Sequence, residues 1–428
     1  MSTNIPEQLP SYKTVTEVFD WGSSISKVII KWLEEIENEN IDKETFKVYA
    51  RRILSEGAYH LSLSSQKNED LKINLGSISK TNDDLEGYRE ITDIYISDEK
   101  GNKKLKDQYI TIEMSVHPKN NLSSVLNYDI KSLYNNYIKP LYTIIQMKSI
   151  KNINNQIIEN YKGDIRPIVD KYTFSHQRVN HLSFPYASYE PSDNEKHPLI
   201  IWLHGLGEGG SDNPALPIMA NKANIFADES IQKYFKGAYV LIPQCPTTWV
   251  HGYKYFGDGT SIYENALIEF IKLYINEHSN IDKTRIYIGG DSNGGYMTMI
   301  LLRDYPNFFT AAFPTCESLK DDLLSDSDII NIGKTPLWLI ASKSDKSIPP
   351  NLFSLPTFQR LNKIGANVHF SFFDKVVDLS GLYFNEQGNP YEYNGHWSWI
   401  YVYNDVCEEE IDGKKIKLME WLASQKKN

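Results

Sequence analysis

Two patterns of apolar and polar residues divide the chain. Up to about residue 150, short segments rich in β-branched and aromatic residues alternate with polar stretches rich in Asn and Lys. Segments of this length and composition are typical of strands, and several of them with turn signals between them predict a small β-sandwich. The predicted strands are 25–32, 45–53, 90–97, 109–116 and 142–150, and the polar stretch 119–139 is predicted to be an extended loop or hairpin connection.

The later part of the chain has longer apolar runs. "HPLIIWLHG" (197–205) is continuously apolar, as expected of a central strand covered on both faces. The segment 181–191 is predicted to be an edge strand closed by Pro191. The continuous pattern recurs at 237–246, 284–290, 309–316, 335–342 and 368–373.

Helical patterns lie between several of these strands. The segment 264–278 places Ala266, Phe270, Leu273 and Tyr274 on one stripe, and 295–306 opens after a glycine pair and ends at a proline. Strands that alternate with helices predict an α/β fold with a mainly parallel sheet and helices on both faces, where sites form at the carboxyl ends of the strands. We therefore expect a smaller β-rich domain at 1–160 and an α/β domain at 161–428.

Composition narrows the class of protein. The 428 residues are 41% hydrophobic and 23% charged, which is typical of a globular protein with a sizeable core. The net charge of −10 argues against a nucleic-acid partner, which needs basic stripes. The three cysteines are widely spaced and odd in number, so neither a disulfide framework nor a cysteine zinc site is expected.

No apolar run is long enough to predict a membrane span, and no apolar segment follows a basic amino terminus. The sequence as written therefore predicts a cytoplasmic protein, or an extracellular one if a signal has been removed.

The stretch "GGDSNGG" carries the first candidate for chemistry. Gly290-Asp291-Ser292-Asn293-Gly294 matches G-x-S-x-G, after an apolar strand that we expect to end at Ile288 and before a helix that we expect to begin after Gly295. A serine pinned between strand and helix needs small neighbours, and this context distinguishes a nucleophile from a serine in a glycine-rich loop. Ser292 is therefore the candidate nucleophile.

A serine hydroxyl needs a base and an acid to orient that base, in the order Ser, acid, His. Only His369 and His396 follow Ser292. His369 lies within a strand pattern, where a structural role is the simpler interpretation, and His396 lies in the loop "NGHWSW", so His396 is the candidate base. Asp345 follows the strand that ends at Ala341 and is the candidate acid, with Asp374 and Asp378 as competitors that are more simply explained as solvated loop residues.

Acyl transfer also needs backbone donors for an oxyanion. Asn293, which follows the nucleophile, is one candidate, and Leu206 in the glycine-rich loop "LHGLGEGGSDN" (203–213) is the other. The same loop does not end in the Lys-Ser/Thr of a phosphate-binding loop and opens no clear dinucleotide-binding unit, so the oxyanion interpretation is preferred.

With these residues in place, the chain from about Tyr172 to Leu422 resembles the α/β-hydrolase superfamily. The segments that carry the likeness are "HPLIIWLHGLGEGGSDN", "VLIPQCPTTW", "RIYIGGDSNGGYMTM", "TPLWLIASKSDKSIPP" and "GHWSWIYVY". It looks like the bacterial esterases of the polyhydroxybutyrate-depolymerase-like and "predicted peptidase" group, some of which carry an amino-terminal immunoglobulin-like domain. The resemblance implies a Ser292–Asp345–His396 triad, an oxyanion hole from Leu206 and Asn293, and Trp249 near the acyl pocket.

The leading functional hypothesis is a serine carboxylesterase that acts on a small or polymer-linked ester, with no metal or organic cofactor. The alternatives are a serine peptidase of the same fold and a non-catalytic binding protein whose β-rich half does the recognising. That half is interpreted as a packing or spacer module, with a module that binds a polymeric substrate as its alternative. The loop 378–395 before His396 is longer than the resemblance implies.

Overall fold

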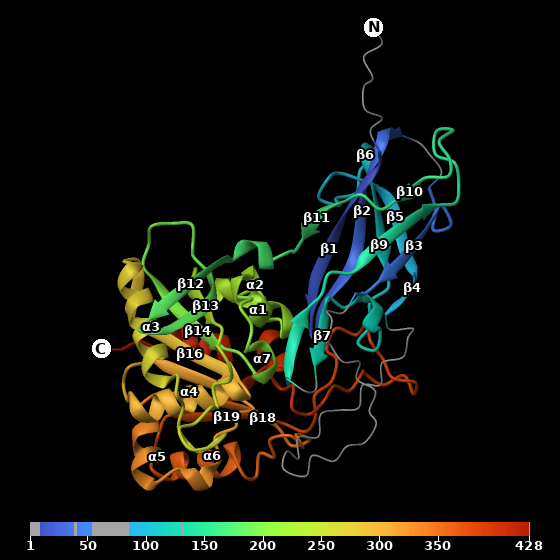
Figure 1. Cartoon of the computed structure of the whole chain (residues 1–428). Coiled ribbons are helices and arrows are strands. Elements are labelled where there is room, and N and C mark those ends of the chain that lie inside the picture. Colours follow the sequence, from blue (N-terminus) through green and yellow to red (C-terminus); the bar gives the residue numbers. More distant parts are fainter. Residues whose placement is uncertain (1–8, 38–40, 54–84, 130–131, 428) are drawn as a thin grey trace. The chain divides into compact units, whose positions relative to one another are not determined.

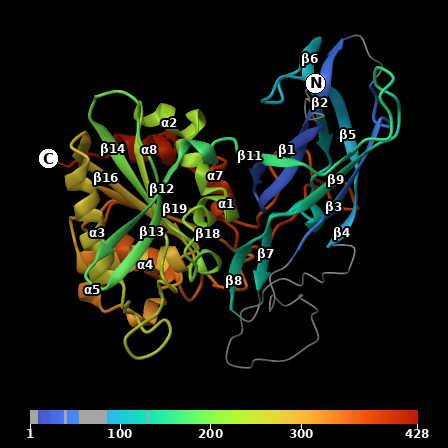
Figure 2. The same ribbon diagram turned by 45° about the horizontal axis from the view of Figure 1, so that its top comes forward.

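The computed structural model describes residues 9–37, 41–53, 85–129 and 132–427. The described residues form two compact units (Figures 1 and 2). The first unit contains the described residues up to Asp170 except 132–135, and the second contains 132–135 and the rest of the chain from Lys171. The first unit extends to Asp170 because the strand after Asn160 pairs in parallel with the first strand of the chain.

The first unit is a sandwich of two sheets, which confirms the predicted β-sandwich. Buried and more exposed side chains alternate along its strands, as expected where one face of a sheet is covered. In β3, Phe46, Val48 and Ala50 are buried and the residues between them are more exposed. Trp32 packs edge-on against Phe46, with ring centroids 6.0 Å apart, and both rings are buried in the core. One sheet has the order β11 (Tyr161–Ile165), β1 (Ser11–Phe19), β2 (Gly22–Glu37), β6 (Lys106–Met114) and β5 (Ile91–Ser97), and the other β10 (Ile157–Ile158), β9 (Leu141–Gln146), β3 (Phe46–Arg51) and β4 (Glu86–Arg89); β7 (Leu126–Asp129) and β8 (Tyr134–Tyr137) form a separate pair.

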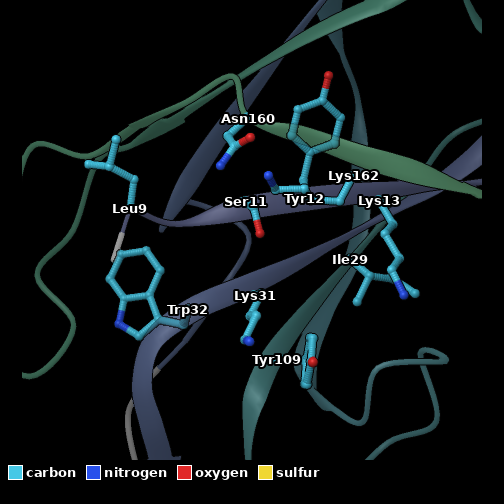
Figure 3. A pocket seen from close by; sticks show the side chains of 10 residues that line it. All are labelled: Leu9, Ser11, Tyr12, Lys13, Ile29, Lys31, Trp32, Tyr109, Asn160 and Lys162. Carbon is cyan, nitrogen blue, oxygen red and sulfur yellow. The ribbon is translucent and has the colours of Figure 1, made fainter. Parts of the chain in front are cut away.

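A pocket of about 470 Å³ opens on the first unit (Figure 3). It is lined in part by Lys13, Lys31 and Lys162, which come from β1, β2 and β11, and by Tyr109 of β6. None of the candidate catalytic residues lines it, and all of them belong to the second unit.

The second unit is built on an eight-stranded sheet, which confirms the predicted α/β class. The first three strands in its order pair antiparallel, and every pair from β15 onward is parallel. All seven residues of β14 are buried, as the continuous apolar run predicted. The order is β12 (Thr173–Val179), β13 (Leu182–Tyr189), β15 (Tyr239–Pro243), β14 (His197–Leu203), β16 (Ile281–Asp291), β17 (Ala311–Thr315), β18 (Leu337–Ser342) and β19 (Val368–Phe373).

Helices cover both faces of this sheet. On one face, Leu199, Ile201 and Leu203 share a core cluster with side chains from α3, α4, α5 and α6. The opposite face carries Trp202, whose ring lies against Phe226 and Tyr403. The helices are α1 (Leu216–Ala220), α2 (Glu229–Phe235), α3 (Glu264–Glu277), α4 (Asn293–Asp304), α5 (Asp326–Ile332), α6 (Ser354–Lys363), α7 (Trp399–Tyr403) and α8 (Leu418–Ser424), with a hairpin of β20 (Glu408–Ile411) and β21 (Lys414–Lys417) before α8.

Three predictions about local structure were wrong. The segment 181–191 is not an edge strand, because β13 pairs with β12 on one side and β15 on the other. Leu273 is 38% exposed, and α3 instead buries Leu267, Ile271 and Ile275 beside the predicted stripe residues. The turn at the candidate nucleophile is tighter than expected, since β16 runs on to Asp291 and α4 begins at Asn293.

Candidate active site

Ser292 occupies the single position between β16 and α4. Its φ of 52° and ψ of −108° are a strained conformation for a residue with a side chain, with a typical cost of about 1–3 kcal/mol. Its N–H donates to the carbonyl of Thr315 at the end of β17, which fixes the turn to the neighbouring strand. The strained turn projects Ser292 from the carboxyl edge of the parallel sheet.

The glycines around Ser292 are required by close backbone contacts. A Cβ on Gly294 would lie 1.9 Å from the carbonyl oxygen of Leu203, at the end of β14. A Cβ on Gly290 would lie 2.6 Å from the same oxygen. The start of α4 therefore packs directly on the end of β14, and only glycine permits that approach.

The structure brings Ser292, His396 and Asp345 into one hydrogen-bonded chain. His396 Nε2 lies 2.8 Å from Ser292 Oγ, and His396 Nδ1 lies 2.7 Å from Asp345 Oδ2. The second carboxylate oxygen, Oδ1, accepts the N–H groups of Ser347 and Ile348, both at 2.9 Å. Asp345 is buried, so its carboxylate is held in one orientation toward the imidazole.

The competing residues lie in other environments. His369 Nδ1 is 3.1 Å from Glu409 Oε2, and the His369 ring packs on Trp338. Asp374 accepts a hydrogen bond from Lys343 Nζ at 2.6 Å, and Asp378 accepts from the hydroxyl of Ser380. The hydrogen bonds of Ser292 and His396 within the described part of the chain lead to Asp345 and to none of these three.

Leu206 and Asn293 each begin a helical segment. Leu206 opens the 3₁₀ turn Leu206–Glu208, and Asn293 opens α4. The first N–H groups of a helix have no partner within that helix, so both amides are available to an external acceptor. Asn293 Oδ1 accepts the N–H of Trp249 at 2.7 Å, which ties the start of α4 to the segment after β15.

Trp249 is a core residue in this structure. Its side chain is fully buried in the core, stacked on Phe184 and close to the ring of His204. The substrate-binding role near an acyl pocket stays a prediction, and the ring itself offers no exposed surface to a ligand. Its contribution to the site is the backbone hydrogen bond to Asn293.

The sequence reasoning missed His204, which holds the Leu206 loop. Its Nδ1–H donates to the carbonyl of Gly205 at 2.6 Å, and its Nε2 accepts the N–H of Cys245 at 2.9 Å. Burial lowers the pKa of His204 to about 4, so the imidazole is neutral and can serve as donor and acceptor at once. Its place directly after a buried strand, before Gly205, was the available signal.

Comparisons with protein families match both units. Residues 11–159 match the family described as the esterase Ig-like N-terminal domain. Residues 263–320, which include the nucleophile turn, match the prolyl oligopeptidase family. No curated protein matches the chain.

Solved structures support the same architecture. The crystal structure of a thermostable esterase matches with a TM-score of 0.72 and 23% identity, over 97% of this chain and 100% of that chain. An acylaminoacyl peptidase from Pyrococcus horikoshii covers 54% of this chain and 40% of its own, with 18% identity and a TM-score of 0.36. A ferulic acid esterase covers 48% of this chain and 90% of its own, with 14% identity and a TM-score of 0.38.

Fold, turn and family matches together define a class. The protein is a serine hydrolase of the α/β-hydrolase fold. Its residues 11–159 match the Ig-like N-terminal domain of esterases, and its fold is similar to that of a thermostable esterase. Among the described residues, no helix is long and apolar enough to cross a membrane.

Proposed function

We propose that the protein is a serine carboxylesterase in which Ser292, His396 and Asp345 form the catalytic triad. The observation that carries the proposal is the hydrogen-bonded chain from Ser292 Oγ through both ring nitrogens of His396 to Asp345 Oδ2. Ser292 itself lies on a strained turn between a strand and a helix, which is the context in which this fold presents a nucleophile to a substrate.

The chemistry follows from these positions. Ser292 Oγ attacks the ester carbonyl carbon and gives its proton to His396 Nε2, while the carbonyl electron pair moves onto oxygen. The N–H groups of Leu206 and Asn293 stabilise that oxyanion. The intermediate collapses, and the leaving alcohol takes the proton from His396. Water then attacks the acyl carbon and gives a proton to His396. The bond from the acyl carbon to Ser292 Oγ breaks, His396 returns the proton to Oγ, and the acid is released.

Ester hydrolysis is favoured over peptide hydrolysis by the N-terminal unit. The family match of residues 11–159 is to a domain of esterases, and the similar full-length structure is described as an esterase. A serine peptidase is the second candidate, because residues 263–320 match the prolyl oligopeptidase family. That match covers the nucleophile turn, which esterases and peptidases share, so it says little about the leaving group.

The test is hydrolysis of p-nitrophenyl esters of increasing acyl length by the full chain and by Ser292→Ala. We expect the substitution to lower kcat by about 10⁴-fold or more, because it removes the nucleophile. Ser327→Ala, which changes an exposed serine, is the matched control. Unchanged hydrolysis in Ser292→Ala would contradict the proposal.

Two further measurements separate the alternatives. An ester and its matching amide, compared by kcat/KM, distinguish an esterase from a peptidase. A fluorophosphonate probe should label wild-type protein and not Ser292→Ala. Wild-type protein that is neither labelled nor able to hydrolyse any ester would contradict the proposed chemistry and favour the non-catalytic binding protein.

A further inference from the structure

Two buried carboxyl groups lie beside the candidate site and take no part in the triad. Glu208 ends the 3₁₀ turn that begins with Leu206, and Asp291 directly precedes Ser292. Their exposed fractions are 2% and 1%. One carboxyl group therefore belongs to each of the two segments that carry the proposed oxyanion donors.

The two carboxyl groups converge over Gly205. A Cβ built on Gly205 would lie 2.6 Å from Asp291 Oδ2 and 3.1 Å from Glu208 Oε2. Because Gly205 has no side chain, both carboxylate oxygens can approach the position that its Cβ would occupy. A larger residue there would push the two groups apart, so the glycine in the "HG" turn has a specific role.

The described polar groups that compensate this pair are uncharged. The Asn221 side chain and the backbone of Gly205 and Glu208 partly offset the effect of burial on the pKa of Glu208, and the Trp202 side chain does the same for Asp291. Glu208 Oε1 accepts from Asn135 Nδ2 at 2.9 Å, and Asp291 Oδ2 has a long contact of 3.4 Å with Asn221 Nδ2. Glu208 Oε2 and Asp291 Oδ1 are buried without a hydrogen-bond partner among the described residues. No described Lys, Arg or His forms an ion pair with either carboxyl group.

The titratable groups around the pair are also uncharged. Tyr403 of α7 and Cys316 after β17 face it, and burial raises the pKa of both well above their ordinary values. His204 is neutral, as described above. Two carboxylates in such a space cannot both be charged without a large electrostatic cost. Burial raises the pKa of Glu208 to about 7, and burial followed by the charge of Glu208 raises the pKa of Asp291.

We propose that Glu208 and Asp291 share one proton, and that the resulting hydrogen bond positions the Leu206 loop against the Ser292 turn. Both are positioning residues, since neither touches the reacting atoms. The proposal rests on the proposed function, because it concerns how the two oxyanion donors are held relative to each other. When the shared proton is lost at alkaline pH, the two negative charges repel each other. The Leu206 N–H then moves away from the position in which it and the Asn293 N–H can bind the same oxyanion.

The discriminating substitution is Glu208→Gln. A glutamine amide donates to the Asp291 carboxylate and fixes the pair with one negative charge, which is the charge of the proton-sharing state. Glu208→Ala removes the bond. We expect Ala to lower kcat about 10- to 100-fold while KM stays within about twofold, because oxyanion stabilisation acts on the transition state. We expect wild-type kcat to fall at alkaline pH, and we expect Gln to recover most of the loss seen with Ala and to remove that alkaline fall.

An infrared titration provides a readout that does not depend on activity. The carbonyl band of a buried protonated carboxylic acid should be present in wild-type protein and weaker in both Glu208→Gln and Asp291→Asn. Glu386→Gln, which changes an exposed glutamate, should leave that band unchanged. This measurement still tests the pair if Glu208→Ala does not fold.

The outcomes separate this inference from the proposed function. Wild-type protein that hydrolyses no ester contradicts the proposed function. If wild-type protein is active, either of two results overturns the inference and leaves the proposed function intact. In the first, Glu208→Ala and Glu208→Gln have the same kcat and the same pH profile as wild type. In the second, the infrared band persists unchanged in both Glu208→Gln and Asp291→Asn.

Discussion

Replacing Glu317 by glutamine should change how stability depends on pH. Glu317 follows the end of β17 and is 1% exposed. Its Oε2 accepts the N–H of Leu319 at 2.8 Å, while Oε1 is buried without a partner among the described residues. Burial raises the pKa of this carboxyl group from an ordinary value of 4.5 to about 8. The folded protein therefore keeps a proton on Glu317 at neutral pH, where an unfolded chain has lost it.

The sign of the effect follows from which state binds more protons. Below pH 4.5 both states are protonated, and the stability contribution is fully present. As the pH rises from 4.5 toward 8, Glu317 loses its proton in the unfolded state but keeps it in the folded state, so the free energy of unfolding falls. At about 1.4 kcal/mol per pH unit, the loss across this window is at most about 5 kcal/mol. Glutamine is neutral at every pH and does not incur it.

The assay is thermal unfolding of wild-type protein and Glu317→Gln at several pH values between 4.5 and 8. Other buried acids affect both proteins equally, so the difference between the two isolates Glu317. We expect similar midpoints at the acid end and a gap that widens with pH. For a unit of this size, roughly 2–4 °C per kcal/mol gives a gap on the order of 10 °C at the alkaline end. Parallel curves would refute a protonated Glu317, and the exposed Glu386→Gln should follow wild type throughout.

Three further substitutions test contacts around the site. Gly294→Ala forces a Cβ to 1.9 Å from the carbonyl of Leu203 and should lower the free energy of unfolding by about 3 kcal/mol or more, measured by denaturant titration. His204→Leu leaves the Cys245 N–H and the Gly205 carbonyl unpaired, so we expect a loss of about 1–3 kcal/mol for each group and a lower kcat; unchanged unfolding would exclude this role. Asp345→Asn should keep KM but lower kcat by about 10⁴-fold, because the imidazole loses its orienting acceptor; a small change in steady-state kinetics would argue against Asp345 as the acid.

The sequence predicted most of the second unit because its signals are local. Continuously apolar strands, the glycines around Ser292 and the order of Ser292, Asp345 and His396 all follow from what parallel strands and a tight turn require. The structure brings those three side chains together within hydrogen-bonding distance. The choice between His396 and His369 also rested on a local signal, a loop against a strand.

Other features could not be predicted because they depend on distant partners. The strand β1 was not predicted, since its buried Thr14 and Thr16 interrupt an apolar pattern, and both hydroxyls bond to Asp164 on β11. In the sequence, Glu208 cannot be distinguished from an exposed polar loop residue, because its neighbour Asp291 is distant in the chain. The position of β13 inside the sheet likewise depends on β12, which the sequence pattern did not distinguish from a loop.

The site is held by two kinds of contact that should respond differently to substitution. Parallel strand pairing brings the ends of β14, β16 and β18 to one edge, and this arrangement depends on long buried ladders. The final placement of the Leu206 loop depends instead on a few buried polar contacts, from His204 and from the two carboxyl groups. Because those contacts lie beyond the ends of the strands, changing them should alter the distance between oxyanion donors while the sheet stays intact. Substitutions of His204, Glu208 and Asp291 are therefore expected to act on kcat more than on the fold. Substitutions at Gly294 are expected to act on both.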